Sequence, residues 1–193
     1  MSVFAQHALA AACAASAALA APIALAAGGR ADERVLPLRT LVRGEHGPTA
    51  IALGTWAAAV TDASGGQTFE LTVKSRDLDK LDAMPWRRRF VVGVVTTHTT
   101  DGYAVSIRRI TLQAIGGGNR QLCVVAAVTG PRPGRVVLQE RTAAYHIVST
   151  PNDVLPSFEA PPAVLRDVSG KLLYKPGGFG FSTPVRPDVC RAR

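Results

Sequence analysis

The sequence predicts a mainly β domain, an antiparallel meander that forms a small sandwich or partly open barrel with one or two short helices. The 193 residues, 47% apolar and 19% charged, suit a single globular domain. From residue 90 onward, β-branched runs and alternating apolar positions recur in short segments. Three to six turn-forming residues separate these segments, which is too few for the crossover helices of a parallel sheet.

The N-terminal segment has the composition of an export signal. Residues 1–27 contain no Lys, Arg, Asp or Glu, and thirteen of the twenty positions from Ala8 to Ala27 are Ala. Small residues at alternate positions, as in Ala24-Leu25-Ala26, are accepted by signal peptidases. We therefore expect residues 1–26 to be removed on export to the periplasm, cell envelope or extracellular space. The alternatives are a buried helix or a retained anchor, and Pro22 and the weak hydrocarbon affinity of Ala argue against the anchor.

Four short elements are predicted before residue 90. The first is a strand over Val35–Val42 with Pro37 near an edge, and the second is a short helix within Ala50–Val60 that contains Trp56. The third is a half-buried strand in which Phe69, Leu71 and Val73 alternate with polar residues. The fourth is one or two helical turns over Asp77–Met84. Gly65-Gly66 separates the second element from the third.

The strand pattern is strongest after residue 90. Phe90–Val95 predicts a buried strand, and the alternation of Tyr103, Val105 and Ile107 predicts a second one. The Asp-Gly pair within His98–Gly102 is typical of a hairpin turn between them. The apolar positions then shift from odd to even numbers, which predicts a β-bulge near Arg108-Arg109.

Further strands are predicted at Gln121–Thr129, Arg135–Gln139 and Tyr145–Val148. We place the β domain at residues 27–150 and a Pro/Gly-rich C-terminal extension at residues 151–193. Within the extension, Val164–Tyr174 predicts a hairpin that turns at Ser169-Gly170. The Gly177–Phe181 segment is predicted to be flexible, and it either packs back on the domain or contacts a partner.

Two cysteines, Cys123 and Cys190, remain after removal of the signal. In an oxidising compartment they form one disulfide, or else they are two unpaired thiols with Cys123 buried. The sequence leaves both alternatives open. Neither cysteine has a Cys or His partner at zinc-binding spacing, so no structural metal is expected.

Several motifs resemble, in order, those of the PrcB-like protease-complex stability domain. They are Arg39–Gly44 and Trp56, the strand Phe90–Val94, the turn Thr100-Asp101-Gly102-Tyr103 with the following Val105-Ser106-Ile107, the loop Pro131–Gly134, and the strand Ala144–Val148. The similarity covers about residues 39–151. Asp101 stands where that family usually has a first Gly, and Ala144 where it has Pro.

The resemblance implies a non-catalytic envelope protein that binds a protein partner, typically a protease or a complex containing one, and stabilises it. It implies no cofactor. The residues expected to contact the partner are Thr100, Asp101, Gly102, Tyr103, Arg132 and Tyr145. Tyr103 has a second interpretation, which its shared parity with Val105 and Ile107 favours, as the first inward residue of its strand.

Two other function classes, a protease inhibitor and a hydrolase, are alternatives to this interpretation. The Thr-Thr-x-Gly-Tyr pattern at residues 99–103 also resembles a loop of chagasin-like cysteine-protease inhibitors, although Gly134 follows Arg132-Pro133 where those inhibitors have Trp. A hydrolase would draw on His46, His98, His146, Asp101 and Ser106, but no Gly-x-Ser-x-Gly or His-Glu-x-x-His motif accompanies them.

The chain is basic, with 22 Lys and Arg against 14 Asp and Glu and a formal charge of +8. Eighteen of the cations are Arg. Export argues against nucleic acid as a partner. The positive charge suits an acidic partner or an anionic envelope surface, in a salt-sensitive contact, and a solvated surface that binds nothing is the alternative.

Overall fold

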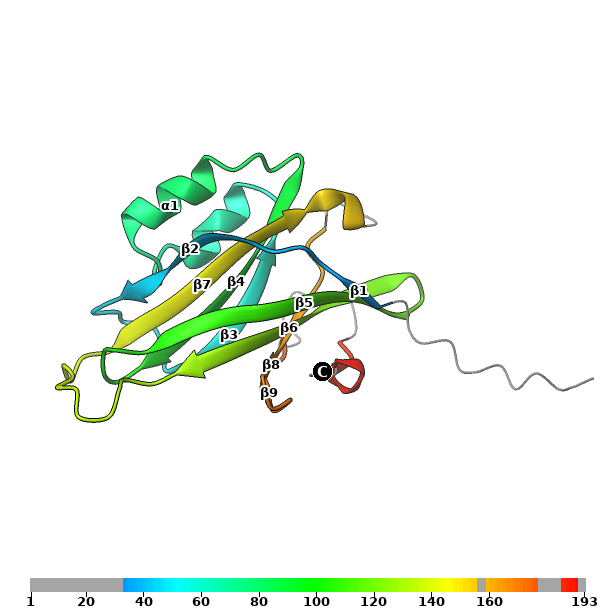
Figure 1. Ribbon diagram of the computed structural model, residues 1–193. Helices are drawn as coiled ribbons and strands as arrows, with labels where there is room; N and C mark the ends of the chain where they lie inside the picture. The colour runs from blue at the N-terminus through cyan, green and yellow to red at the C-terminus, as the bar shows by residue number, and fades with distance from the viewer. Residues whose placement is uncertain (1–32, 156–158, 177–184, 191–193) are drawn as a thin grey trace, which may run out of the picture.

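Two β-sheets pack face to face, and short helices cover the outer face of one of them (Figure 1). This computed structural model describes residues 33–155, 159–176 and 185–190. The predicted export signal and the Gly177–Phe181 segment lie outside the described residues. The elements are β1 (Glu33–Val35), β2 (Arg39–His46), β3 (Gly54–Val60), the 3-10 helix η1 (Ser64–Phe69), α1 (Ser75–Asp82), β4 (Arg89–His98), β5 (Ala104–Gly116), β6 (Asn119–Thr129), β7 (Thr142–Pro151), η2 (Asn152–Val154), β8 (Ala163–Asp167), β9 (Leu172–Tyr174) and η3 (Pro187–Val189).

The first sheet has the strand order β1-β5-β6-β8-β9, and the second has the order β2-β7-β4-β3. Neighbouring strands are antiparallel, except that β8 runs parallel to β6. The mainly β fold class, a small sandwich with short helices, is therefore confirmed. The strand order is not that of a single meander, because β7 inserts between β2 and β4, and β8 returns beside β6.

The sandwich core lies between the two sheets. Strands β4, β5 and β6 contribute most of it, and their alternating apolar residues face one another across the layer. Leu165 on β8 is fully buried in the same core. The C-terminal extension therefore supplies part of the sandwich through residues 163–167.

A second apolar layer lies between the β2-β7-β4-β3 sheet and the helices. Leu81 of α1 and Phe69 of η1 are buried against Val91, Val95 and Ile147 of this sheet. Phe69 lies over Gly93 so closely that a Cβ at that position would be 2.3 Å from the ring. Trp56 of β3 stacks on Phe69 with ring centroids 5.7 Å apart.

Two predicted elements before residue 90 have the wrong type. The Ala-rich segment predicted as a helix is the strand β3, and it pairs with β4 from Gly54↔Thr97 to Val60↔Val91. This pairing overrides the helix propensity of Ala, which is the highest of the residues but is commonly outweighed by tertiary context. The segment predicted as a strand at Phe69–Val73 is the end of η1 and a helical turn, in which Val73 N–H donates to Phe69 C=O at 3.0 Å. Phe69 and Val73 are buried as a strand also predicts, because positions i and i+4 share a face in both structures, whereas Leu71, which a strand would bury with them, is 72% exposed.

Two predictions after residue 90 are also wrong. Residues 99–103 do not form a hairpin, because they carry the chain from β4 in one sheet to β5 in the other. Arg135–Gln139 is not a strand and belongs to the loop 130–141.

Several local predictions are confirmed. The β5–β6 ladder changes register between Ile107 and Arg109, which places the bulge where the apolar parity shifts. The strands β8 and β9 form the C-terminal hairpin. The helix α1 covers most of the predicted helical turns. The strand predicted at Val35–Val42 is divided into β1 and β2, which join different sheets.

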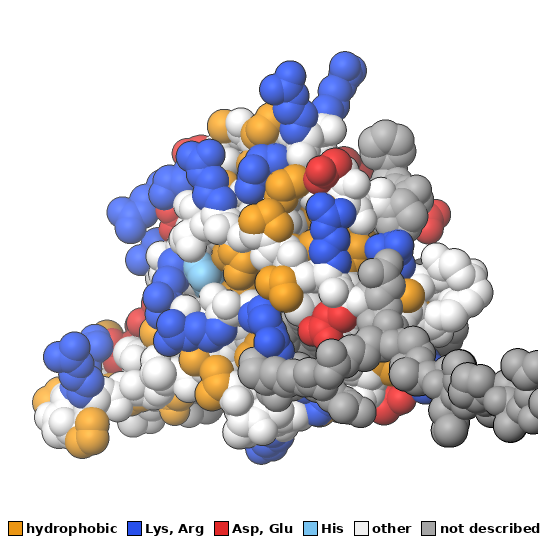
Figure 2. All heavy atoms as spheres, turned by 45° about the vertical axis from the view of Figure 1, so that its right-hand side comes forward, with side chains coloured by type: hydrophobic (Ala, Val, Ile, Leu, Met, Phe, Trp, Pro, Cys, Tyr) orange, Lys and Arg blue, Asp and Glu red, His pale blue; other side chains and the backbone are white. Residues whose placement is uncertain are grey.

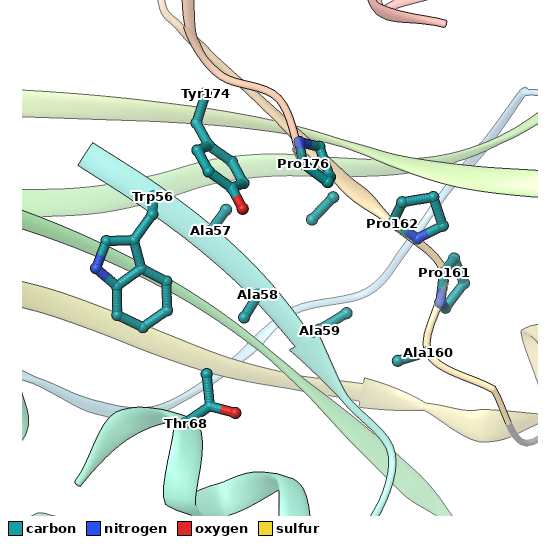
Figure 3. Close-up of a pocket in the computed structure, with 11 residues that line it drawn as sticks. Trp56, Ala57, Ala58, Ala59, Thr68, Ala160, Pro161, Pro162, Tyr174 and Pro176 are labelled. Atoms are coloured by element: carbon teal, nitrogen blue, oxygen red, sulfur yellow. The ribbon is translucent and has the colours of Figure 1, made fainter. Parts of the chain in front are cut away.

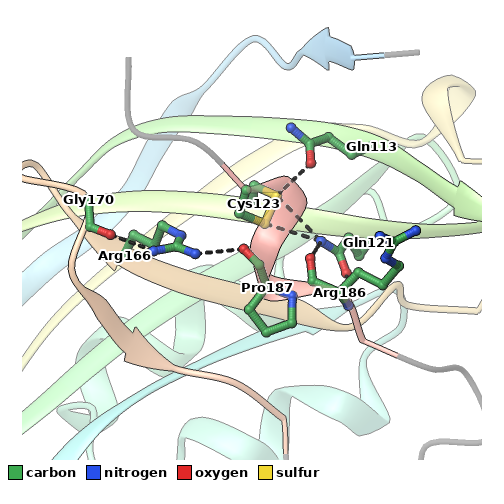
Figure 4. The surroundings of a disulfide bond; sticks show 8 residues. Gln113, Gln121, Cys123, Arg166, Gly170, Arg186 and Pro187 are labelled. Carbon is green, nitrogen blue, oxygen red and sulfur yellow. Dashed lines mark hydrogen bonds between the residues drawn. A yellow bond between two sulfur atoms is a disulfide. The ribbon is translucent and has the colours of Figure 1, made fainter. Parts of the chain in front are cut away.

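Of the two alternatives for the cysteines, the structure contains the disulfide. Cys123 of β6 and Cys190 after η3 are joined, with Cα atoms 5.3 Å apart (Figure 4). Gln121 anchors the same segment, because its amide donates to Arg186 C=O at 2.7 Å and accepts from Arg186 N–H at 2.8 Å. Arg166 of β8 donates to Pro187 C=O at 2.6 Å. The disulfide and these polar contacts together hold residues 185–190 against the outer face of the β1-β5-β6-β8-β9 sheet.

Candidate partner-binding site

Three loops meet at one end of the sandwich. They are residues 47–53 between β2 and β3, residues 99–103 between β4 and β5, and residues 130–141 between β6 and β7. The strand register brings them together, because it pairs Gly54 with Thr97, Ala104 with Thr129, and His98 with Thr142. We call this region the three-loop end. In Figure 1 the 130–141 loop projects from it at the lower left.

Hydrogen bonds connect the three loops. Thr97 Oγ1 donates to Ala52 C=O at 2.7 Å, and Thr142 Oγ1 donates to Thr100 C=O at 2.9 Å. Asp101 N–H donates to Leu138 C=O at 3.2 Å, and Leu138 N–H donates back to Asp101 Oδ1 at 2.9 Å. Because each loop is bonded to a strand or to another loop, the end is a braced surface on a rigid scaffold.

Glu45, at the end of β2, is a central acceptor in this network. One oxygen of its carboxylate accepts from Gly102 N–H at 2.8 Å and lies 3.0 Å from Thr142 Oγ1, whose one hydroxyl hydrogen it shares with Thr100 C=O. Gly102 has φ +88°, the positive dihedral expected from the Asp-Gly pair, and a Cβ there would lie 3.0 Å from Pro131 Cβ. A larger residue at position 102 would therefore strain the backbone and push the 130–141 loop away.

Tyr103 and His98 stack at the base of the 99–103 loop, with ring centroids 3.4 Å apart. Tyr103 is half-buried and packs against the sandwich core, as its shared parity with Val105 predicts. His98 Nε2 lies 2.9 Å from Thr96 Oγ1. Burial lowers the pKa of His98, and the negative charge of Glu45 opposes this shift. His98 thus serves as a neutral stacking partner near pH 7.

Five of the six residues expected to contact a partner lie at the three-loop end. They are Thr100, Asp101, Gly102, Tyr103 and Arg132. Arg132 is exposed, and Asp101 forms an ion pair with Arg135 at 3.6 Å.

Tyr145 is the exception, and its assignment is wrong. It is 0% exposed and lies in the layer beneath the helices. Its hydroxyl donates to Asp77 Oδ2 at 2.6 Å, and burial together with this carboxylate raises the pKa of Tyr145 to about 12. A residue enclosed in this way supports the fold and is not available to a partner.

The exposed apolar residues of the 130–141 loop were not predicted from the sequence. Val136 is 91% exposed and Leu138 is 61% exposed. Their alternation led to the prediction of a strand, although the flanking run of Gly and Pro at residues 130–134 favours a loop. Arg132, Arg135 and Arg141 lie in the same loop. Figure 2 shows basic and hydrophobic side chains together on the lobe at its lower left.

A cavity of about 270 Å³ lies elsewhere, beside the free edge of β3 (Figure 3). Its lining consists mainly of small and apolar side chains from β3 and from residues 160–163, together with Thr68, Tyr174 and Pro176. Trp56 and Tyr174 supply the aromatic walls, and burial raises the pKa of Tyr174. This chemistry suits an apolar group.

The hydrolase candidates are divided between two regions: His46, His98 and Asp101 lie at the three-loop end, whereas Ser106 and His146 lie farther along β5 and β7. His146 lies between the sheets, where its Nδ1 accepts from Ile107 N–H at 2.8 Å and its Nε2 lies 3.0 Å from Thr40 Oγ1. The contacts of His98 and Asp101 are those of the three-loop end. Within the described ranges no three His, Cys, Asp or Glu side chains are grouped to hold a metal ion. No helix in those ranges has the length and apolar character to cross a membrane.

Comparisons of the chain with protein-family models, with curated proteins and with solved structures found no match.

Proposed function

We propose that this chain is an exported, non-catalytic protein-binding domain that contacts its partner through the three-loop end. Following the PrcB-like resemblance, the partner is a protease or an envelope complex that contains one, and binding stabilises it. The exposure of Val136 and Leu138 beside three arginines of the same loop is the observation that carries the proposal.

Exposure of apolar side chains to water is unfavourable, so Val136 and Leu138 contribute favourable free energy when a partner covers them. Loops usually place polar residues outward, and apolar side chains presented by a braced loop are typical of interaction sites. Bracing reduces the entropy lost on binding, because hydrogen bonds to Asp101 already order Leu138. Arginine is enriched at interfaces, where it contacts carboxylates and apolar surface together. The surface therefore fits a partner with an apolar pocket and an acidic rim.

Two features support export. The N-terminal composition is that of a signal, and the Cys123–Cys190 disulfide is of the kind that persists in oxidising compartments.

Site-specific photocrosslinking in the native envelope tests the proposal. A photoreactive residue at position 138 is expected to capture a protein partner. The same photoreactive residue at position 35 is the control. Val35 is also 61% exposed, but it lies on β1 opposite Thr111 of β5, away from the three-loop end.

The identity and fate of the captured protein separate the function classes. Capture of a protease, or of a complex containing one, whose lifetime falls without this chain supports the proposal. Capture of a protease whose activity this chain suppresses in a dose-dependent way identifies the inhibitor class instead. Equal capture from positions 35 and 138, or none, contradicts a binding site at the three-loop end.

A further inference from the structure

The backbone hydrogen bonds of β4 alternate between its two neighbouring strands. Asn152 N–H donates to Arg88 C=O at 2.9 Å, which extends the β4–β7 pairing by one position. In an antiparallel ladder every second residue bonds the same neighbour. The even-numbered residues of β4 therefore bond β7 and the odd-numbered residues bond β3, because no bulge interrupts either register.

The strand β3 consequently has a free hydrogen-bonding edge. Its even-numbered residues are opposite the odd-numbered residues of β4 and bond to them. The backbone N–H and C=O groups of Thr55, Ala57 and Ala59 point away from β4. β3 is the last strand of its sheet, and within the described residues no strand other than β4 pairs with it. These backbone groups are therefore open to a further strand.

The opposite edge of the same sheet, β2, is protected against such pairing. It carries Arg39, Arg43 and Glu45, and a bulge lies between Thr40 and Val42. Charged side chains and bulges keep edge strands from pairing with other chains. The seven residues of β3 include no charged residue and no Pro, and the β3–β4 register is regular. Of the two edges of this sheet, β3 is thus the one that accepts a strand.

The apolar cavity of about 270 Å³ lies along this edge and extends to both sides of it. Trp56 and Thr68 line it on the helix side of β3, and Tyr174 and Pro162 line it on the sandwich side (Figure 3). None of its lining residues is charged. Because successive side chains of a strand point to opposite faces, a strand added to β3 would present side chains to both sides in turn.

We propose that β3 binds an extended peptide segment of another protein as an added strand, with a large apolar side chain in the cavity. The peptide backbone bonds Thr55, Ala57 and Ala59, and the three consecutive alanines of β3 leave room beside them for the large side chain. An aromatic ring fits this volume, since an apolar cavity of about 150 Å³ binds benzene. The inference goes beyond the proposed function, because it assigns a peptide site to a surface other than the three-loop end.

A peptide strand satisfies both features of this site, whereas other occupants satisfy only one. A small apolar ligand or a lipid chain would fill the cavity but cover the backbone donors and acceptors of the edge without bonding them. A second copy of β3 would pair with the edge, but it would bring alanines toward the cavity, and its Trp56 is already stacked on Phe69. A charged ligand would meet no opposite charge among the lining residues. The site therefore selects an uncharged extended segment with a large apolar residue.

Hydrogen exchange of the full chain, followed by NMR, tests the inference. The probe is the blocked peptide Thr-Val-Thr-Phe-Thr-Val-Thr with a C-terminal Lys-Lys pair for solubility, in which the β-branched residues favour an extended conformation. We expect it to protect the amides of Thr55, Ala57 and Ala59 from exchange at least about tenfold. The amides of Trp56 and Ala58 are the internal control, because they already bond β4 and should change less than about twofold.

Two changes separate the side-chain contact from the backbone contact. Replacement of the Phe of the peptide by Ala should weaken binding about 30-fold, because the cavity is then left empty. Ala59→Pro removes an outward N–H and places its ring where the added strand would lie, so it should weaken binding at least about tenfold.

Arg43→Pro is the matched control on the β2 edge. Arg43 is opposite His146, whose backbone bonds β4, so the N–H of Arg43 also points away from its sheet. The affinity for the peptide should change less than about twofold. Thermal melting of both proline variants checks that the fold is kept, and if either fails to fold, the exchange pattern of the unaltered chain decides.

Four results would overturn the inference. Absence of binding up to about 1 mM peptide would exclude the site, and binding without protection of Thr55, Ala57 and Ala59 would identify a pocket for an apolar group alone. Protection that grows with protein concentration in the absence of peptide would identify a second copy as the occupant. Protection in the dilute, peptide-free monomer would mean that another segment of this chain covers the edge. Crosslinking from position 138 is read separately, so failure of the peptide site and failure of the three-loop end are distinguishable.

Discussion

Tyr145 and His146 are neighbours on β7, yet they belong to different layers of the molecule. Tyr145 faces the helices and bonds an ionised partner, Asp77. His146 faces the other sheet, where it bonds a hydroxyl and a backbone N–H. Both side chains are polar and buried, and their polar atoms bond to other parts of the fold. Tyr145 was nevertheless predicted to contact a partner, and His146 is a residue type common in hydrolytic catalysis.

The two faces of this sheet therefore use buried polar groups in different ways. On the helix side, a charge-assisted hydrogen bond holds α1 to the sheet. On the sandwich side, a neutral imidazole links two strand edges across the layer. Residue type alone does not separate structural roles from functional ones, because the same polar groups serve in both. Burial decides whether such a group can contact a partner or substrate.

The largest effect is expected on the helix side, from Gly93→Ala. The new Cβ would meet Phe69 Cε1 at 2.3 Å and Cζ at 2.5 Å, so the ring and its stacked Trp56 must move. We expect a loss of about 3 kcal/mol in the free energy of unfolding, measured by urea denaturation. Gly66→Ala is the control, because that glycine is buried but a Cβ there meets nothing within 4 Å. Equal losses in the two variants would show that close packing on Gly93 is not the cause.

Removal of one hydroxyl tests the charged contact on the same side. Tyr145→Phe takes the donor from Asp77, and a buried hydrogen bond to a charged group contributes about 2 kcal/mol to stability. Burial raises the pKa of Asp77, but the Tyr145 hydroxyl and Lys80 outweigh it, and the net shift is downward. The variant should therefore show a higher Asp77 pKa by NMR titration. An unchanged carboxylate pKa in a destabilised variant would point to packing instead.

The pH dependence of stability tests the contacts of His146 on the sandwich side. The pKa of His146 is about 4 in the folded protein and near 6.5 unfolded, so the unfolded chain binds more protons between these values. Stability is complete above pH 6.5 and falls as the pH decreases toward 4. The loss is about 2 kcal/mol, less than the full shift implies because solvent screens part of the charge.

Denaturation at several pH values measures this loss. His146→Gln has no titrating ring and should flatten the curve between pH 4 and 6.5. His98→Gln is the comparison variant, because the pKa of His98 is also lowered but its ring lies at the three-loop end. If only His98→Gln flattens the curve, the cross-sheet bridge is not the acid-sensitive element.

The same contrast explains what could be predicted from the sequence. Alternation in β5 and β6 follows burial on a pleated strand, so both strands and the bulge after Ile107 were predictable. The path of residues 99–103 was not, because an Asp-Gly turn is a local signal and the sheet that a strand joins depends on distant partners. β4 pairs with β7, about fifty residues away along the chain, and β5, which follows β4 directly, belongs to the other sheet.

The candidate site was predictable in part for the same reason. The turn residues Thr100–Gly102 carry a local signal, and the structure places them at the three-loop end. The exposure of Val136 and Leu138 is a property of the assembled fold, since an apolar pair in a short alternating segment usually indicates a buried strand. The prediction for Tyr145 was wrong because β7 is covered on both faces, so its side chain is buried although its type is common at interfaces.

The smallest effect on stability is expected where nothing covers the side chain. Val136→Ser/Leu138→Ser should change the free energy of unfolding by less than about 0.5 kcal/mol, because both side chains are already in water in the free chain. The backbone bonds between Leu138 and Asp101 remain. Crosslinking from a photoreactive residue at position 132 in this background should nevertheless be lost, since binding removes the apolar surface from water and folding does not. Unchanged capture would mean that the arginines alone hold the partner, and a loss of stability comparable to that of Tyr145→Phe would mean that the loop packs on the fold.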